Sequence, residues 1–364
     1  MDIRHVSKPP KNVVEFPEYA EYKGPDDPDL SPADVQHVVE IFETPLTGSY
    51  NWDYSVQDDR IRKLYELGKQ LNWNVEVDID WSLPMQEEIA PDVNTFLNYE
   101  PYAKLDEAGR KEVNHHLNAW TLSQFLHGEQ GALLVASQLA CCAPSYNAKL
   151  YAASQTFDEA RHVEAFNKLI QTRIGHSYPI DPSLKFLLDK ILTDPRWDLK
   201  FIGMQLVIEG FALSAFNTMK MVSEGSIVGE LLHYIIRDEA RHVTFGVNYL
   251  EGFVQTLSEQ EKEDRAMFAY EACVVARERL IPTGVFEHFG WNVEEAREIY
   301  LKGPLVSQFR NLLFTRIIPN LRRIGLLTDA VRPKFEELGL LEFENMPDDY
   351  DIDWAEISKP LNAA

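Results

Sequence analysis

Apolar residues recur at helical spacing along most of the chain. On residues 106–141 they stand mostly three, four or seven positions apart, with polar Gln124 interrupting the stripe, at Val113, Leu117, Trp120, Phe125, Ala132, Val135, Ala136 and Leu139. After residue 100 almost no segment alternates apolar and polar residues as a strand does. We therefore expect an all-α protein built as a helical bundle.

Turn and capping residues divide this region into separate helices. Pro144, Gly225 with Ser226, and a capping box from Ser258 to Glu261 stand at the boundaries. The predicted long helices cover residues 106–141, 146–174, 182–193, 196–223, 226–257 and 259–280, and shorter ones cover 293–301, 304–323 and 328–338.

The first hundred residues lack this regularity. Residues 1–57 are rich in Pro, Asp and Gly, with one helical candidate over 31–43, and a second helix is predicted over 58–72. The segment that follows has no partner strand and is predicted to be irregular. Trp73 and Trp81 are expected to anchor it on the body of the protein.

The composition fits a folded globular protein. The chain has 364 residues, of which 45% are hydrophobic and 26% are charged. We expect three parts, namely an irregular N-terminal arm with short helices over 1–105, the bundle over 106–280, and short helices with a tail over 281–364.

Charge and apolar runs exclude two kinds of partner. The net charge of −23 repels phosphate backbones and anionic lipid headgroups, so neither nucleic acid nor a membrane surface is expected to bind. The longest apolar run, taken as 131–143, is too short to span a bilayer.

Cys141, Cys142 and Cys273 do not form an even disulfide framework, which favours a reducing compartment and a cytoplasmic protein.

One hexapeptide, DEARHV, occurs twice, at residues 158–163 and 238–243, an offset of 80. In each copy the glutamate is preceded 30 residues earlier by another glutamate and followed three residues later by a histidine. The six residues are Glu129, Glu159 and His162 in the first half, and Glu209, Glu239 and His242 in the second.

The spacing of these residues predicts two helical hairpins. Two residues 30 apart on one straight helix would be separated by about 45 Å, so a turn must lie between them. Pro144 and Gly225 stand near the middle of the two intervals. A spacing of three puts each glutamate and histidine on one helical face. Two hairpins packed face to face would bring four carboxylates and two imidazoles together.

Such a cluster requires cations. An isolated buried charge costs several kcal/mol or is neutralised by a pKa shift. Two divalent ions nearly balance four carboxylates, and mixed oxygen and imidazole donors suit iron or manganese better than calcium or structural zinc. A glutamate from each of two helices and a Glu-x-x-His from each of two others is the ligand set of ferritin-like di-metal carboxylate proteins.

Over about residues 106–255 the sequence resembles the ferritin-like di-iron carboxylate family. The doubled pattern is most similar to its oxygen-activating branch, which includes the hydroxylase subunits of bacterial multicomponent monooxygenases and the small subunit of class I ribonucleotide reductase. The resemblance implies a ferritin-like four-helix bundle with flanking helices, two iron ions or an Mn/Fe pair, dioxygen as co-substrate, and the metal ligands Glu129, Glu159, His162, Glu209, Glu239 and His242. It also implies that Asp158 and Asp238 accept the other ring N–H of the histidines, with Arg161 and Arg241 neutralising these aspartates.

Three positions depart from the relatives. Phe166 stands where ribonucleotide reductase small subunits commonly have a radical-bearing tyrosine, and Leu213 stands where the multicomponent hydroxylases usually have a threonine. The arylamine N-oxygenase branch tends to have a third histidine one turn before the last glutamate, where this chain has Ile235. Each of these branches therefore fits imperfectly.

Residues about one turn from the ligands outline a substrate pocket. They are mostly apolar and include two alanines, which favours a small apolar or aromatic substrate, amines included. The predicted lining is Phe125, Ala132, Leu133, Phe166, Ala212, Leu213 and Phe216. The other candidates are assigned to packing or to the surface, namely His115, His116, His127, His233, Tyr151 and Tyr234.

We favour a di-iron oxygenase or oxidase acting on such a substrate. Two alternatives are a radical-generating subunit similar to that of ribonucleotide reductase and an iron-handling ferritin-like protein. The sequence contains no flavin, nicotinamide or iron–sulfur motif, so the electrons are expected from a separate reductase or ferredoxin. A homodimer is also considered, although the amphipathic helix over 259–280 fits packing in its own core better than a dimer contact.

Overall fold

The prediction of an all-α fold is confirmed. The computed structural model describes residues 14–15, 41–56, 58–85, 95–350 and 352–357. The predicted helix over 31–43 lies outside these residues except for 41–43, which are irregular. Within the described part, the only strands are the two-residue β1 (Val14–Glu15) and β2 (His176–Ser177), which pair antiparallel. All other regular elements are helical.

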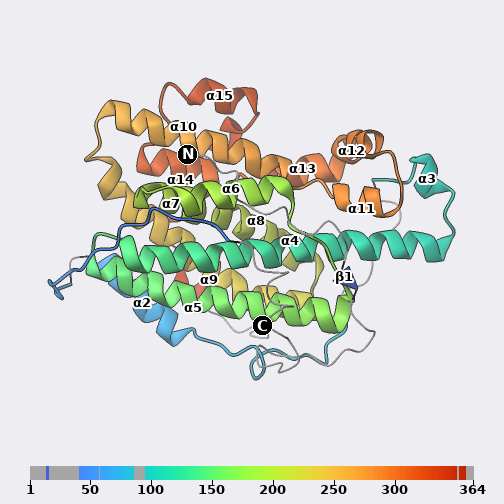
Figure 1. The fold of residues 1–364 in the computed structure, drawn as a ribbon, viewed down its shortest axis with the longest axis horizontal. Coiled ribbons are helices and arrows are strands. Elements are labelled where there is room, and N and C mark those ends of the chain that lie inside the picture. The colour runs from blue at the N-terminus through green and yellow to red at the C-terminus, as the bar shows by residue number, and fades with distance from the viewer. Residues whose placement is uncertain (1–13, 16–40, 57, 86–94, 351, 358–364) are drawn as a thin grey trace.

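Four long helical segments form the bundle, and Figure 1 shows α4 and α5 running side by side. The third segment is continuous and contains a π-helical stretch, η3, between two α-helical parts. The segments are α4 (Glu107–Cys142), α5 (Tyr146–Leu169) with its π-helical end η2 (Ile170–Ile174), α7 (Trp197–Lys200) with η3 (Phe201–Ile208) and α8 (Glu209–Val222), and α9 (Ile227–Val254).

Both predicted hairpins are present, and local sequence explains their turns. After Pro144 the Ser145 side chain accepts a hydrogen bond from the Ala148 N–H and caps α5. Gly225 has φ +76°, a left-handed conformation that favours glycine, and Ser226 then caps α9 in the same way as Ser145 caps α5. Each hairpin therefore turns about midway between its two glutamates.

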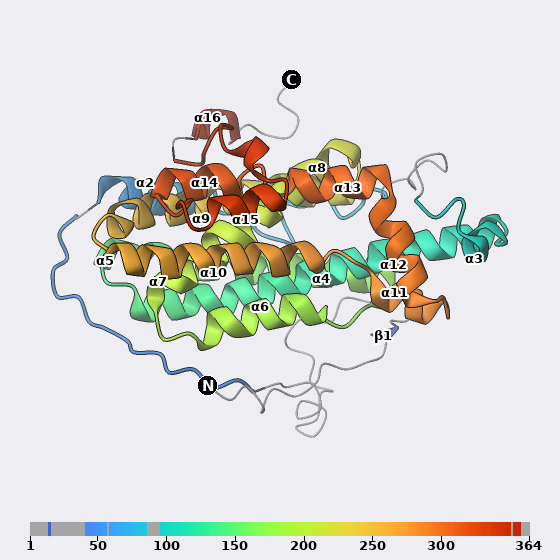
Figure 2. The same cartoon turned by 90° about the horizontal axis from the view of Figure 1, so that it is seen from above.

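The flanking helices cover the bundle, and Figure 2 shows α10 lying along it beside α6. The buried face of α10 consists of Ala266, Ala269, Ala272, Cys273 and Ala276, so this helix packs in its own core as expected. The flanking elements are α2 (Asp59–Gln70), α3 (Glu100–Ala103), α6 (Pro182–Thr193), α10 (Glu259–Glu278), α11 (Thr283–His288), α12 (Val293–Lys302), α13 (Pro304–Leu312), α14 (Ile317–Ile324), α15 (Arg332–Glu337), the 3₁₀ turn η4 (Leu341–Phe343) and α16 (Trp354–Ile357).

The C-terminal region differs from the sequence prediction. One helix was expected over 304–323, but the structure has α13 and α14 separated by residues 313–316. Pro319 explains the break, because it has no N–H for a helical hydrogen bond and its ring would clash with the carbonyl of residue 315, whereas the first turn of a new helix accepts it. The short helices α3, α11 and α16 were not predicted, since segments of four to six residues carry little periodicity.

The helix from Trp197 to Val222 is the most apolar one in the described part of the chain. It is long and apolar enough to cross a bilayer, but its apolar window is entirely buried inside the bundle. Its composition is therefore that of a central core helix. The sequence prediction had instead taken residues 131–143, most of which lie on α4, as the longest apolar run.

Close packing of α9 against η3 depends on Gly246. A Cβ added there would lie 2.5 Å from the Cβ of Gln205. We expect Gly246→Ala to lower the free energy of unfolding by about 1–3 kcal/mol, because the two backbones would have to separate. Gly252→Ala, on the exposed side of the same helix with no atom within 4 Å of the new Cβ, should stabilise the protein by up to about 1 kcal/mol. Thermal unfolding compares the two, and equal melting temperatures would contradict this packing role.

Candidate metal centre

The six residues of the doubled motif meet in the middle of the bundle. Glu129 lies midway along α4, Glu159 and His162 lie on α5, and Glu239 and His242 lie on α9. Glu209 is the first residue of α8, directly after the π-helical η3. All six side chains are buried, with at most 4% of any residue exposed.

Two overlapping groups of ligand atoms can each hold a metal ion. In each group the ligand atoms all lie within 4.8 Å of one another. One group adds Glu129 and His162 to a shared pair of glutamates, and the other adds Glu209 and His242 to the same pair. The shared pair is Glu159 and Glu239, so these two carboxylates can contact both ions.

Both histidines present the same ring nitrogen to this cluster. His162 Nδ1 lies 3.1 Å from both Glu129 Oε2 and Glu239 Oε1. His242 Nδ1 lies 3.1 Å from Glu159 Oε1 and 3.4 Å from Glu239 Oε2. The Nε2 atoms are bonded elsewhere, which leaves each Nδ1 available as a metal donor.

The aspartates behind the histidines are connected crosswise. His162 Nε2 lies 3.1 Å from Asp238 of the second half, and His242 Nε2 lies 3.3 Å from Asp158 of the first. Each aspartate therefore orients the histidine of the other hairpin. The structure thus places the predicted aspartates behind the histidine rings, with the two halves exchanged.

Two buried arginines complete this layer. Arg161 Nη2 contacts Asp158 at 2.5 Å and Asp238 at 3.1 Å. Arg241 Nη2 contacts the same two aspartates at 3.0 and 2.6 Å. The two guanidinium groups offset the two aspartates, so the charge of the four glutamates is still to be balanced.

The pKa values of the four cluster glutamates are shifted in both directions, because burial raises those of Glu129 and Glu209, whereas neighbouring groups lower those of Glu159 and Glu239 in spite of burial. Burial raises the pKa of Glu129 to about 8 and that of Glu209 well above its ordinary value, and neighbouring glutamates add to both shifts. Burial opposes the charged form of His162, yet hydrogen bonds to Asp238 and Glu129 raise its pKa well above the usual range. The site therefore holds extra protons where metal ions would supply the positive charge.

Unpartnered atoms in the cluster also fit metal ions. Among the described residues, Glu159 Oε2, both oxygens of Glu239 and His242 Nδ1 are buried without a hydrogen bond. Buried polar atoms are normally hydrogen-bonded, and the close approaches of Glu239 Oε1 and His242 Nδ1 to other cluster atoms lack hydrogen-bond geometry, so metal ions fit as partners of these four atoms. Carboxylate oxygens and imidazole nitrogens are the donors that iron and manganese accept.

Two glutamines beside the cluster were not predicted to take part in it. Gln155 Nε2 donates to Glu159 Oε1 at 3.0 Å and to Glu209 Oε1 at 3.3 Å. Gln205 Nε2 donates to Gln155 Oε1 at 2.6 Å. Each glutamine stands four residues before a cluster glutamate. This spacing puts the two side chains on one helical face and could have indicated that they lie together.

Trp73 has a larger role than the anchoring expected of it. Its Nε1 donates a 2.7 Å hydrogen bond to Asp238 Oδ2, and its ring stacks 6.2 Å from that of His162. Trp81, by contrast, is half-buried and donates to the carbonyl of Val75. The irregular segment after α2 thus reaches the residues behind the cluster, which a local sequence pattern does not reveal.

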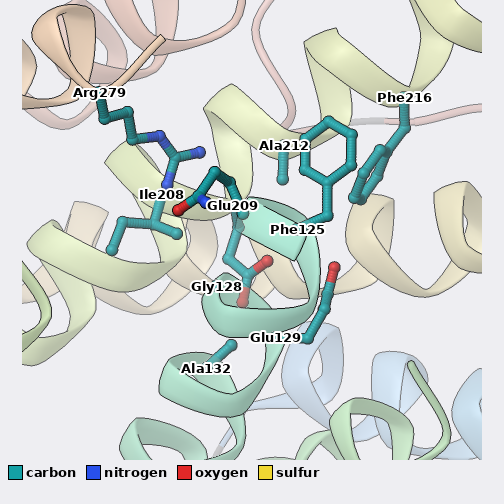
Figure 3. A pocket seen from close by; sticks show the side chains of 10 residues that line it. Phe125, Gly128, Glu129, Ala132, Ile208, Glu209, Ala212, Phe216 and Arg279 are labelled. Atoms are coloured by element: carbon teal, nitrogen blue, oxygen red, sulfur yellow. The ribbon is translucent and has the colours of Figure 1, made fainter. Parts of the chain in front are cut away.

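A small pocket opens beside Glu129 and Glu209 (Figure 3). Four predicted residues line it, namely Phe125, Ala132, Ala212 and Phe216, together with Gln124, Gly128, Ile208 and Arg279, which were not predicted. Of the remaining predictions, Phe166 packs behind the lining against the Phe125 and Phe216 rings, and Leu133 and Leu213 are not part of the lining. The cavity volume is about 10 Å³, room for about one water molecule.

A helical bundle around this cluster defines a ferritin-like di-metal carboxylate protein. The model of the family described as p-aminobenzoate N-oxygenase AurF matches residues 55–325, more than half of the chain. The chain belongs to this family and is a di-metal oxygenase or oxidase, as favoured from the sequence. The imperfect fit inferred from Ile235, which is fully buried on α9, therefore did not exclude this branch.

Solved structures with similar folds include a point mutant of an R2-like ligand-binding oxidase with an anaerobically reconstituted Mn/Fe cofactor. It is 20% identical, with 73% of this chain and 93% of that chain covered and a TM-score of 0.46. The dimanganese(II) NrdF of Streptococcus sanguinis is 15% identical, with 77% and 92% covered and a TM-score of 0.49. A comparison with curated proteins found no match.

Replacing a donor that belongs to both groups, or one that belongs to a single group, should prevent full metal loading. We expect Glu159→Ala to lose both ions, because its carboxylate belongs to both groups, and His242→Ala to lose at least the ion of its own group. Glu112→Ala, on the exposed side of α4, should load as the wild type does. Elemental analysis after loading with Fe(II) or Mn(II) measures this, and full loading of either cluster variant would refute the assignment.

Removing the hydrogen bond from Trp73 should weaken the centre without removing a ligand. We expect Trp73→Phe to reduce metal affinity by roughly 10-fold, because residues that orient ligands typically contribute 10- to 100-fold. Trp81→Phe removes a hydrogen bond to the Val75 carbonyl instead of one to an aspartate and should leave affinity unchanged. Competition with a metal chelator compares the two, and equal affinities would contradict a role for Trp73 at the centre.

Proposed function

We propose that this protein inserts oxygen from dioxygen into the amino nitrogen of an aromatic amine. The observation that carries the proposal is the pair of overlapping donor groups directly beside an apolar pocket. The family name, which refers to N-oxygenation of p-aminobenzoate, supports the choice of an aromatic amine. The proposed metal ligands are Glu129, Glu159, His162, Glu209, Glu239 and His242.

The geometry of the donors supports different roles for the glutamates. Glu159 and Glu239 belong to both groups, so either carboxylate would be available to both ions. Glu129 and Glu209 each belong to one group and also line the pocket, so they face the incoming substrate. When bound, two iron ions, or a manganese and an iron ion, supply the electrons that reduce dioxygen.

The pocket lining supports an aromatic ring as the substrate body. The rings of Phe125 and Phe216 lie 4.8 Å apart with a T-shaped orientation, and Ala132 and Ala212 leave room beside them. A cavity with room for one water does not accept a substituted benzene, so the two phenylalanine rings are expected to move apart as the substrate enters. Once closed, the same rings would exclude water from the metals.

Turnover requires electrons from outside the protein, and a separate reductase or ferredoxin is the proposed donor. The three cysteines are free thiols, which supports a reducing compartment and the cytoplasm as the proposed location. All six donors come from one chain, so the site does not need a second copy. The proposal is therefore compatible with a homodimer as well as with a monomer.

Oxidation of aromatic amines tests the proposed function. Fe(II)-loaded protein given a chemical reductant, ¹⁸O₂ and either aniline, 4-aminobenzoate or 4-aminobenzamide should form N-oxygenated products that contain ¹⁸O, measured by mass spectrometry. Gly128→Leu places a side chain at the pocket, where a Cβ meets no atom within 4 Å, and should reduce turnover at least ~10-fold while metal content is unchanged. Gly252→Leu, exposed on α9, is the control. Oxygen consumption without an ¹⁸O-containing N-oxygenated product from any of the three amines would refute the proposal.

A further inference from the structure

Three basic side chains lie together where the hairpin of α8 and α9 turns. Lys220 lies in the last turn of α8, and its Nζ donates a 3.0 Å hydrogen bond to Nδ1 of His233 on α9. Arg237 stands four residues after His233 and therefore on the same face of α9. We call Lys220, His233 and Arg237 the basic cluster.

In the part of the chain that the structure describes, no carboxylate pairs with the basic cluster, although the chain has 58 acidic residues. Arg237 Nε is buried without a hydrogen bond to any described residue, and its guanidinium carbon lies 4.7 Å from the centre of the Tyr234 ring. Asp238 follows Arg237 in the chain, but its oxygens accept hydrogen bonds from Arg161 and Arg241. Charged groups at this depth normally have a counterion.

The carboxylates of neighbouring segments are directed elsewhere. Glu230 Oε1 on α9 accepts a 2.7 Å hydrogen bond from the Asp80 N–H. Asp78 Oδ2 accepts one of 2.7 Å from the Asn74 N–H. Glu224, in the turn between α8 and α9, is exposed and forms no ion pair with a described residue. The counterion of the basic cluster therefore does not come from these carboxylates.

The charges of the basic cluster oppose one another. Burial, together with the positive charges of Lys220 and Arg237, lowers the pKa of His233 to about 4, so this imidazole is neutral at pH 7. Because an ammonium group can only donate, His233 Nδ1 accepts from Lys220 and Nε2 carries the proton. Burial and the charge of Arg237 also lower the pKa of Lys220. Two like charges are thus held close together, which an anion would relieve.

We propose that the basic cluster binds a phosphate group, either that of inorganic phosphate or that of a small phosphate monoester. A phosphate monoester carries a charge of about −1.5 to −2 at pH 7 and three strong acceptor oxygens, which match two positive charges and the N–H donors beside them. A carboxylate or chloride ion would leave one positive charge without a partner. Met221 and Val222, which follow Lys220, are exposed, so this end of α8 is open to solvent.

The proposed phosphate site is separate from the pocket, whose lining includes none of the three residues. The inference therefore does not depend on the oxidation of an amine. A phosphate held there would connect α8, which begins with Glu209, to α9, which carries Glu239 and His242. Because a ligand that binds only the native state stabilises it, phosphate should raise the melting temperature of the protein.

Calorimetry with inorganic phosphate and with phenyl phosphate tests the inference on the Mn(II)-loaded full-length protein, at an ionic strength kept constant with sodium chloride. One phosphate should bind per chain, and the better of the two ligands identifies the source of the group. Lys220→Met and Arg237→Met should each weaken binding at least ~10-fold, as expected for charge-assisted hydrogen bonds, and Arg237→Lys should retain part of it. Melting temperatures without phosphate establish that each variant is folded.

Two variants on α2 control for the general loss of positive charge. Lys69→Met and Arg62→Met each remove one charge that pairs with Glu66, and both should bind phosphate as the wild type does. Equal weakening in these variants and in the variants of the basic cluster would overturn the inference, because it would indicate a non-specific effect of net charge.

Phosphate could instead bind to the metal ions. Metal-free wild type and Glu159→Ala, which is expected to lose both ions, separate the two sites, since binding at the basic cluster should persist in each. Binding that disappears with the metal would overturn the inference. The same holds for the absence of saturable binding by the wild type, or for unchanged affinity in Lys220→Met and Arg237→Met.

Discussion

Mutual repulsion of four buried carboxylates is the constraint on which this structure depends. Burial and the neighbouring charges raise the pKa of Glu129 to about 8 and hold that of Glu209 higher than usual, and within the described part of the chain Glu159 Oε2 and both oxygens of Glu239 have no hydrogen bond. Only concentrated positive charge at that point makes the arrangement favourable. The histidines, the aspartates behind them and the arginines that pair with these aspartates all serve to position that charge.

Sequence reasoning predicted the six side chains that the fold brings together, because their signal is repeated and local. The glutamates and histidines lie on regular helices, where a spacing of three guarantees one face, and Pro144 and Gly225 place the turns. The positions of Trp73 and Arg279 could not be predicted in this way, because Trp73 reaches Asp238 and Arg279 reaches the pocket from segments outside the four bundle helices. No periodicity within the sequence encodes such a contact.

The boundaries of the helices also differ in how well the sequence predicts them. The long helices follow strong apolar periodicity and agree with prediction within a few residues, whereas the break before Pro319 and the π-helical η3 depend on individual hydrogen bonds. The π-helical stretch ends where Glu209 begins, and segments of this kind frequently occur at functional sites. Gln205 lies within this stretch and donates to Gln155, which in turn donates to Glu209.

The crosswise bonds between His162 and Asp238, and between His242 and Asp158, make the two repeats interdependent. Each repeat supplies a histidine but borrows the acceptor that holds it in place, so neither hairpin is a self-sufficient binding unit. Loss of either aspartate would therefore loosen a histidine on the opposite hairpin. The two halves of the chain thus act as one binding unit, which neither could form alone.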